Sequence, residues 1–124
     1  QLHGSENKDR VADIKNMGLK VIKTIKVEEE QDIDKYKEFD NADIILFDTP
    51  SMEKSLEFPK SLITKLPFGA KYALAGSISE NNLEYINKLG VNFFDLSSSL
   101  ENQLGFKDHL KIKNFIKKIN EIKN

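Results

Sequence analysis

The residue best placed for chemistry is Asp48, which ends the apolar run 42–48, ADIILFD. A carboxyl group at the exit of a buried strand faces a pocket where burial raises its pKa, and such a group suits general acid or base catalysis. An aspartate there can instead cap the strand-to-helix turn by accepting hydrogen bonds from backbone N–H groups. The local sequence leaves both roles open, and we take Asp48 as the candidate catalytic residue.

Three further polar side chains accompany neighbouring apolar runs and could hold a substrate. Gln1 and His3 are two residues apart, so they lie on the same face of an extended segment. Asp95 lies within the run 91–97, VNFFDLS. A single histidine is more often structural than functional, but at a strand end each of these side chains could hydrogen-bond a ligand. We expect Gln1, His3 and Asp95 to bind substrate.

Two short segments are candidates for binding a phosphate group. Gly76 and Ser77 follow the run 71–76, and Ser98 and Ser99 belong to a triple serine that follows Asp95. Backbone N–H groups at a strand exit or at the start of a short helix bind phosphate oxygens, and glycine lets the backbone approach closely. A plain serine-rich turn and helix cap would have the same sequence, so this alternative also remains open.

The composition excludes several classes of function. The chain has 124 residues, 39% of them hydrophobic and 31% charged, which is typical of one globular domain. A net charge of −1 gives no field that attracts nucleic acid or an anionic membrane. The chain has no cysteine, which excludes a disulfide, a thiolate metal site and a cysteine nucleophile or base within it. We expect a cytoplasmic protein with no nucleic-acid or membrane partner.

The elements that position these side chains alternate between short apolar runs and amphipathic segments. The expected strands are 1–4, 20–27, 42–48, 71–76 and 91–97. This spacing is typical of repeated βα units with parallel strands, and the near-continuous apolar runs indicate strands covered on both faces. The pattern predicts an α/β fold of five βα units in one domain, 1–124. Periodicity alone does not separate an open doubly wound sheet from an arc of a (βα)8 barrel.

Caps and apolar spacing predict the helices. We expect Ser5 to cap a first helix that ends at Gly18, and Ser79 and Asp108 to cap two later ones. A segment from Glu28 to Phe39 and one beginning near Pro59 complete the set. The expected buried positions are Val11, Ile14 and Met17 in the first helix, Leu83, Ile86 and Leu89 in the fourth, and Ile112, Phe115, Ile116, Ile119 and Ile122 in the last.

The order of these motifs resembles the second part of phosphoribosylanthranilate isomerase. The similar segments are QLHG, VIKTIKV, ADIILFDT, LAGSISENNLEYI and FFDLSSSLENQLGFKDHLKIKNFI, which together cover nearly the whole chain. The family is a (βα)8 TIM barrel enzyme of tryptophan biosynthesis. It carries out an Amadori rearrangement of N-(5-phosphoribosyl)anthranilate without a metal or organic cofactor. The resemblance therefore implies a partial TIM barrel of five βα units.

The resemblance also implies roles for single residues. Asp48 matches the general acid that protonates the ring oxygen of the substrate, while Gln1 and His3 match residues that face the substrate. Gly76 with Ser77, and Ser98 with Ser99, match the two halves of the phosphate site. The general base of the family is a cysteine in a KxCG motif, and it comes, like the arginine that holds the anthranilate carboxylate, from the part of the barrel that this chain does not match.

Three departures from the family pattern involve glycine. Ser77 and Ser99 stand where LAGG and SSG have glycine, and the loop after LFDT contains no glycine. At a tight anion-binding turn, a Cβ atom takes up space that the anion needs, or it strains the backbone where the turn needs a positive φ. We therefore expect a weakened phosphate site.

Three interpretations follow. The chain is the carboxyl-terminal portion of an isomerase that begins at Gln1 through proteolysis or design, or a degenerate half-barrel that binds or self-associates without catalysis, or an unrelated flavodoxin-like sheet. In the first two cases we expect the isolated chain to be inactive. We also expect it to associate with itself or with a complementary N-terminal half, because a five-strand arc leaves its edges and inner face uncovered.

Overall fold

The computed structural model describes residues 1–49, 60–76, 78–91 and 93–123, and in that part of the chain the fold is α/β. A parallel sheet contains β1 (Ile22–Lys26), β2 (Ile44–Asp48) and β3 (Tyr72–Leu74), in the order β1-β2-β3. Ile22 pairs with Ile44 and Lys26 with Asp48, so β1 and β2 are matched along their whole length. The three strands lie within the predicted runs 20–27, 42–48 and 71–76.

The two outer runs differ from the prediction. We expected strands at 1–4 and 91–97, but the structure has one isolated parallel bridge at each place, Leu2 with Lys23 and Leu74 with Phe94. Each segment has a neighbour on one side only among the described residues, so its pairing is limited to a few backbone bonds. Examples are the bonds from the N–H of Leu2 to the carbonyl of Ile22 (2.8 Å) and from the N–H of Asp95 to the carbonyl of Leu74 (3.0 Å).

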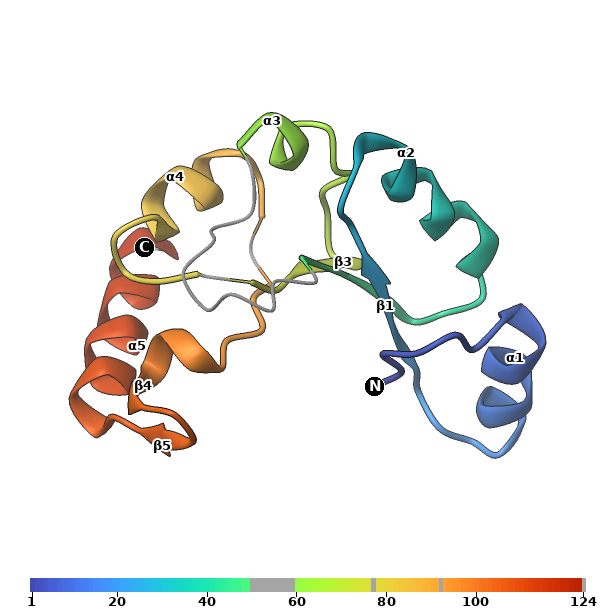
Figure 1. The fold of residues 1–124 in the computed structure, drawn as a ribbon, viewed down its shortest axis with the longest axis horizontal. Helices are drawn as coiled ribbons and strands as arrows, with labels where there is room; N and C mark the ends of the chain where they lie inside the picture. Colours follow the sequence, from blue (N-terminus) through green and yellow to red (C-terminus); the bar gives the residue numbers. More distant parts are fainter. Residues whose placement is uncertain (50–59, 77, 92, 124) are drawn as a thin grey trace.

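The helices follow one another along the outer side of the sheet, which forms an arch (Figure 1). In chain order they are α1 (Lys8–Asn16), α2 (Glu30–Ile33), the 3-10 helix η1 (Asp34–Phe39), α3 (Lys60–Ile63), α4 (Leu83–Lys88), the 3-10 helix η2 (Ser98–Leu100) and α5 (His109–Lys123). None of the helices among the described residues is both long and apolar enough to cross a membrane.

Some of the predicted helix details are wrong. The first helix is capped by Asn7 and not by Ser5, because the side chain of Asn7 accepts a hydrogen bond from the N–H of Arg10. Met17 is 74% exposed and Ile116 is 54% exposed, although both were predicted to be buried. Met17 lies at the C-terminal end of α1, beyond the last full turn, and Ile116 follows the buried Phe115 by one residue, so it points about 100° away from it.

Another helix prediction is confirmed. The carboxylate of Asp108 accepts hydrogen bonds from the N–H groups of Leu110 (2.9 Å) and Lys111 (3.1 Å), which makes it the cap of α5. The predicted cap Ser79 is wrong, because α4 (Leu83–Lys88) has Asn82 at its N-cap position; the hydroxyl of Ser79 instead accepts a hydrogen bond from the N–H of Asn81 in the turn that precedes this helix. The structure also contains an antiparallel pair that we did not predict, β4 (Glu101–Gln103) and β5 (Phe106–Lys107).

The sheet has two different faces. On the outer face Ile45, Phe47 and Leu74 are fully buried in the main core, packed with residues of the helices such as Phe115 and Leu83. The inner face carries a smaller cluster of Leu46, Ala73 and Ala75, with Ile22 and Ile44 against it. The alternation of side chains along each strand thus separates the structural core from a second face that can hold a site.

Candidate active site

The inner face of the sheet ends in charged side chains. Thr24 and Lys26 alternate with the outward-facing residues of β1, and Leu46 and Asp48 do the same in β2. Because Lys26 pairs in register with Asp48, the two side chains lie beside each other at the carboxyl end of the sheet. This is the edge where parallel α/β proteins place their sites.

Asp48 has an environment that favours its protonated form. Burial is the main cause that raises the pKa of its carboxyl group above the ordinary value, and the negative charge of Asp95 raises it further. The backbone N–H of Thr49, which donates a hydrogen bond to the carboxylate, and the side chains of His3 and Lys26 act in the opposite direction. The bond from Thr49 shows that Asp48 makes the turn-capping contact that its sequence position allowed.

The predicted substrate-binding residues come from the two outer segments that flank the sheet, next to the bridges at Leu2 and Phe94. The side-chain amide of Gln1 donates a hydrogen bond of 3.0 Å to the carboxylate of Asp95. The Nδ1 atom of His3 lies 3.4 Å from the hydroxyl of the buried Thr24. A cavity of about 220 Å³ lies on the inner face, lined by Gln1, Ile22, Leu46, Ala73, Phe93, Phe94 and Asp95. Its lining combines apolar side chains with two polar ones, a mixture that small-molecule sites share.

Gly76 lies directly beside the candidate acid. Its φ is +111°, a conformation that residues with a Cβ rarely adopt. A Cβ atom built there would lie 3.4 Å from the hydroxyl of Thr49 and 4.0 Å from Oδ1 of Asp48. The absence of a side chain at this position therefore leaves room next to Asp48 for a ligand or for the backbone to approach it.

Residues 1–118 match the family model described as N-(5'phosphoribosyl)anthranilate (PRA) isomerase. The chain belongs to this family. It is 41% identical over 135 aligned residues to N-(5'-phosphoribosyl)anthranilate isomerase of Petrotoga mobilis, with 99% of this chain and 61% of that protein covered.

Solved structures of phosphoribosylanthranilate isomerases, which are TIM-barrel proteins, superpose on the chain. The enzyme of Thermotoga maritima gives a TM-score of 0.81 at 29% identity and covers 98% of this chain and 60% of that one. A structure of the isomerase in complex with reduced 1-(o-carboxyphenylamino)-1-deoxyribulose 5-phosphate gives a TM-score of 0.74 at 28% identity. The chain spans about three fifths of the length of these isomerases.

The segments expected to form the isomerase phosphate site follow neighbouring strand positions. Gly76 follows β3, and Ser98 and Ser99 lie in η2, after the bridge between Leu74 and Phe94. Their exits lie on the same edge because that bridge is parallel. The hydroxyl of Ser99 is buried and has no hydrogen-bond partner in the described part of the chain. Ser77 lies outside the described residues.

The backbone argument against a serine at position 99 does not hold in this structure. No described residue other than glycine has a positive φ, so Ser99 occupies η2 in an ordinary conformation. Its Cβ therefore brings no conformational strain of the kind expected from the loss of a glycine in the isomerase pattern. The glycine-free loop after LFDT falls on residues 50–59, outside the described part of the chain.

Sequence reasoning missed two lysines near the predicted isomerase site. Lys26 lies beside Asp48. Lys107 donates to the carbonyl (3.1 Å) and hydroxyl (3.3 Å) of Ser97 at the start of the serine turn. The signal for Lys26 was its even spacing from Thr24 in VIKTIKV, and that for Lys107 was the GFKD motif. Among the described residues no group of three or more histidine, aspartate or glutamate side chains could hold a metal ion.

Proposed function

We propose that this chain carries the general-acid part of a phosphoribosylanthranilate isomerase site. The observation that supports it is the position of Asp48 at the carboxyl end of β2, where burial and the charge of Asp95 raise its pKa. A carboxyl group that keeps its proton nearer to neutral pH can donate it, which is the task of a general acid.

The proposed reaction is an Amadori rearrangement of N-(5-phosphoribosyl)anthranilate in tryptophan biosynthesis. Asp48 gives its proton to the ring oxygen as the bond between that oxygen and C1 breaks, and the nitrogen lone pair forms a C=N bond to C1. A general base then removes the C2 proton, and the resulting enamine tautomerises to the ketose. Each step moves a proton and a bond pair, so the proposal includes no cofactor.

The substrate roles follow the geometry of the same edge. His3 and Asp95 flank Asp48, as their effects on its pKa indicate, and Gln1 fixes the orientation of Asp95 through its hydrogen bond. We assign these three residues to the sugar and the anthranilate nitrogen. Gly76, Ser77, Ser98 and Ser99 are assigned to the phosphate, since backbone N–H groups and hydroxyls at strand exits suit that anion.

The proposed architecture is one domain, 1–124, that forms five βα units of a (βα)8 barrel. The bridges at Leu2 and Phe94 extend the parallel sheet by one strand position on each side, which supports this count. The chain has no cysteine, so the general base of the family would come from a complementary polypeptide that pairs with these two outer positions. The cytoplasm is the location that we propose for such a biosynthetic protein.

The test combines the chain with the missing part of the barrel. The chain alone is expected to show no isomerase activity, and a mixture with the N-terminal two fifths of the Petrotoga mobilis isomerase is expected to turn over. Asp48→Asn in that mixture should lower kcat by about 10²–10⁴-fold, the usual contribution of a general acid. Asp34→Asn is the control, because Asp34 only pairs with Lys37 on the surface, with its side chain 71% exposed.

A non-catalytic, self-associating half-barrel is the alternative, and binding separates the two proposals. The reduced deoxyribulose 5-phosphate analogue should bind the mixture in calorimetry and bind more weakly to Gly76→Ala. If the mixture assembles but neither binds the analogue nor turns over, the isomerase proposal is wrong and the half-barrel alternative stands.

A further inference from the structure

A buried lysine, Lys23, precedes Thr24, the residue of β1 whose hydroxyl lies next to the His3 ring. Lys23 is in β1 on the outer face of the sheet, and only 3% of its surface is exposed. Its ammonium group donates a hydrogen bond of 2.8 Å to the carbonyl of Gly4 and lies 3.4 Å from Oε1 of Glu6. The same group lies 5.1 Å from the centre of the Phe39 ring. The ammonium group therefore has two polar partners in the loop and one aromatic neighbour.

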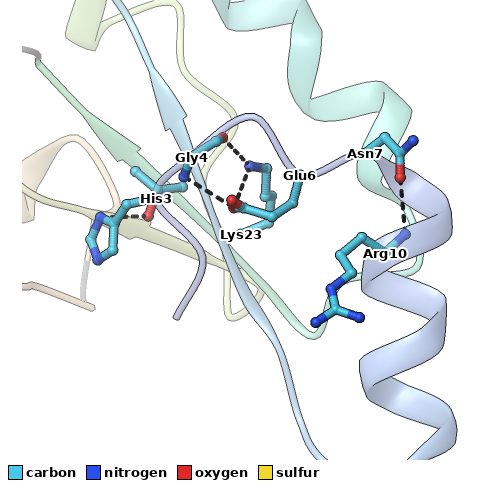
Figure 2. A network of polar contacts seen from close by, with 7 residues as sticks. His3, Gly4, Glu6, Asn7, Arg10 and Lys23 are labelled. Atoms are coloured by element: carbon cyan, nitrogen blue, oxygen red, sulfur yellow. Dashed lines mark hydrogen bonds and ion pairs between the residues drawn. The ribbon is translucent and has the colours of Figure 1, made fainter.

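Glu6 completes a closed network with the loop that follows His3 (Figure 2). Its Oε1 atom accepts a hydrogen bond of 3.0 Å from the N–H of Gly4 as well as facing Lys23. The bond from Gly4, together with the charge of Lys23, keeps the pKa of Glu6 below its ordinary value. A Cβ atom on Gly4 would lie 2.5 Å from Oε2 of Glu6, so a side chain at that position would move the carboxylate of Glu6.

The network is connected to His3 through the backbone. Gly4 follows His3, and Thr24, whose hydroxyl lies 3.4 Å from the His3 ring, follows Lys23. The carbonyl that Lys23 holds is therefore the next one after His3, and Figure 2 shows the imidazole on the side of the segment away from the ammonium. A groove of about 560 Å³, lined by residues 3–7 together with Lys35, Glu38 and Phe39, leaves open space beside this loop.

Burying the ammonium group of Lys23 costs free energy of folding. Removing an ammonium group from water carries a desolvation cost that an apolar side chain of the same length avoids, and replacing buried ion pairs by apolar residues is often neutral or stabilising. Stability alone does not explain the lysine. What the ammonium provides, and an apolar side chain does not, is a fixed position for the carbonyl of Gly4 and the carboxylate of Glu6.

We propose that Lys23 is a positioning residue that holds the segment from His3 to Glu6 and thereby places the imidazole of His3 beside Thr24, on the face of the sheet that also carries Asp48. The inference rests on the proposed function only in taking that face as the site. Lys23 itself does not face the substrate, since its side chain lies on the opposite face of β1 from Thr24 and Lys26.

The experiment observes the two histidines of the chain, His3 and His109, by NMR after selective labelling of their imidazole nitrogens. Lys23→Met keeps the unbranched side chain as far as its fourth atom and removes the ammonium group. In this variant the His3 resonances are expected to shift, and the cross-peak between the His3 ring and the Thr24 methyl group is expected to be lost. His109 lies at the start of α5 and serves as the internal reference that does not shift.

Lys15→Met is the control for the contacts, at a lysine whose side chain is 36% exposed where that of Lys23 is 3% exposed. Lys15 makes almost the same contacts as Lys23, a hydrogen bond of 2.8 Å to the carbonyl of Asn41 and an ion pair of 3.3 Å with Asp43. Asp43 precedes β2 and lies at the other end of the sheet, where it also accepts from the N–H of Val21. General loosening of the fold would move His3 in both variants, whereas positioning moves it in Lys23→Met alone.

Gly4→Ala provides a second variant that keeps the buried charge. Its methyl group displaces the carboxylate of Glu6, so His3 is expected to shift here too, and this variant decides the question if Lys23→Met does not fold. The proposal is overturned if His3 stays unchanged in the folded variants, or if Lys15→Met moves it equally. This readout needs no turnover. If His3 responds to Lys23→Met as expected but the mixture with the N-terminal part shows no turnover, only the isomerase proposal is contradicted.

Discussion

The side chains of Gln1 and Asp95 are joined by a hydrogen bond of 3.0 Å although 94 residues separate them in the chain. Gln1 precedes the bridge at Leu2, and Asp95 follows the bridge at Phe94. The bond therefore connects the two outer positions of the parallel sheet across its inner face. It also fixes the carboxylate whose charge acts on Asp48.

Replacing Gln1 by leucine should loosen this connection. We expect the free energy of unfolding in urea to fall by about 0.5–1.5 kcal/mol, the usual net contribution of a hydrogen bond. Gln31→Leu is the matched control, because Gln31 makes an exposed bond only to Glu29, two residues away. The Asp95 carboxyl resonance should shift in Gln1→Leu and stay unchanged in the control; equal behaviour of the two variants would show that the bond is absent in solution.

The charges around Asp48 should change its pKa in opposite directions. Asp95→Asn removes a negative charge that raises this pKa, so the pKa should fall, whereas His3→Gln removes a group that lowers it, so the pKa should rise. Titration of the Asp48 carboxyl carbon by NMR measures both. A change of the same sign in the two variants would contradict the proposed geometry.

The raised pKa of Asp48 also makes the fold sensitive to pH. The folded state holds this proton more tightly than the unfolded chain, whose aspartates titrate near about 4. Stability should therefore decrease as pH rises from about 4 through the folded pKa. Asp48→Asn removes this dependence, so the variant should gain stability relative to the wild type between pH 4 and pH 7. Denaturant unfolding at several pH values tests this.

Gly76→Ala should cost more than backbone strain alone. Gly76 and Gly18 both have a positive φ, +111° and +87°, but a Cβ atom on Gly18 meets nothing within 4 Å. We expect Gly18→Ala to lose about 1 kcal/mol and Gly76→Ala about 1–3 kcal/mol of unfolding free energy. Only Gly76→Ala should also shift the Asp48 resonance, because its methyl group would contact the hydroxyl of Thr49.

Asp32 should stabilise the fold at neutral pH only. Its carboxylate accepts hydrogen bonds from Lys35 and from the N–H groups of Glu28 and Glu29, which lowers its pKa to about 2. This contribution is present above the unfolded pKa and is lost as pH falls toward 2. Asp32→Asn should cost about 1 kcal/mol at pH 7, as for a lost cap, and almost nothing at pH 2. A difference that persists at pH 2 would mean that the charge is not involved.

The elements with the clearest apolar pattern were the ones that the sequence predicted well. The run ADIILFD became β2, and Asp108 caps α5 as its position indicated. The start of α1 was not predictable in this way, since Ser5 and Asn7 are both good caps. What decides between them is tertiary: Glu6 folds back onto Gly4 and Lys23, so the helix begins only after it.

The sequence was sufficient to name the residues of the candidate site but not to predict which of them contact each other. The end of an apolar run identified Asp48, and the motifs identified Gln1, His3 and Asp95. That Gln1 contacts Asp95, and not a neighbour in the chain, depends on the curvature of the whole sheet, which no local pattern contains. β4 and β5 were missed because ENQLGFK has no alternation of apolar and polar residues.

The order of the parallel strands has a consequence for how the chain folds. The paired residues Leu2 and Lys23, Ile22 and Ile44, Ile45 and Tyr72, and Leu74 and Phe94 are separated by 21, 22, 27 and 20 residues. Each strand can therefore join its predecessor after closing a loop of similar, modest length, with no large entropic step. The contact between Gln1 and Asp95 spans 94 residues and should form last. Pulsed hydrogen exchange during refolding should show β1 and β2 protected before the bridge at Phe94.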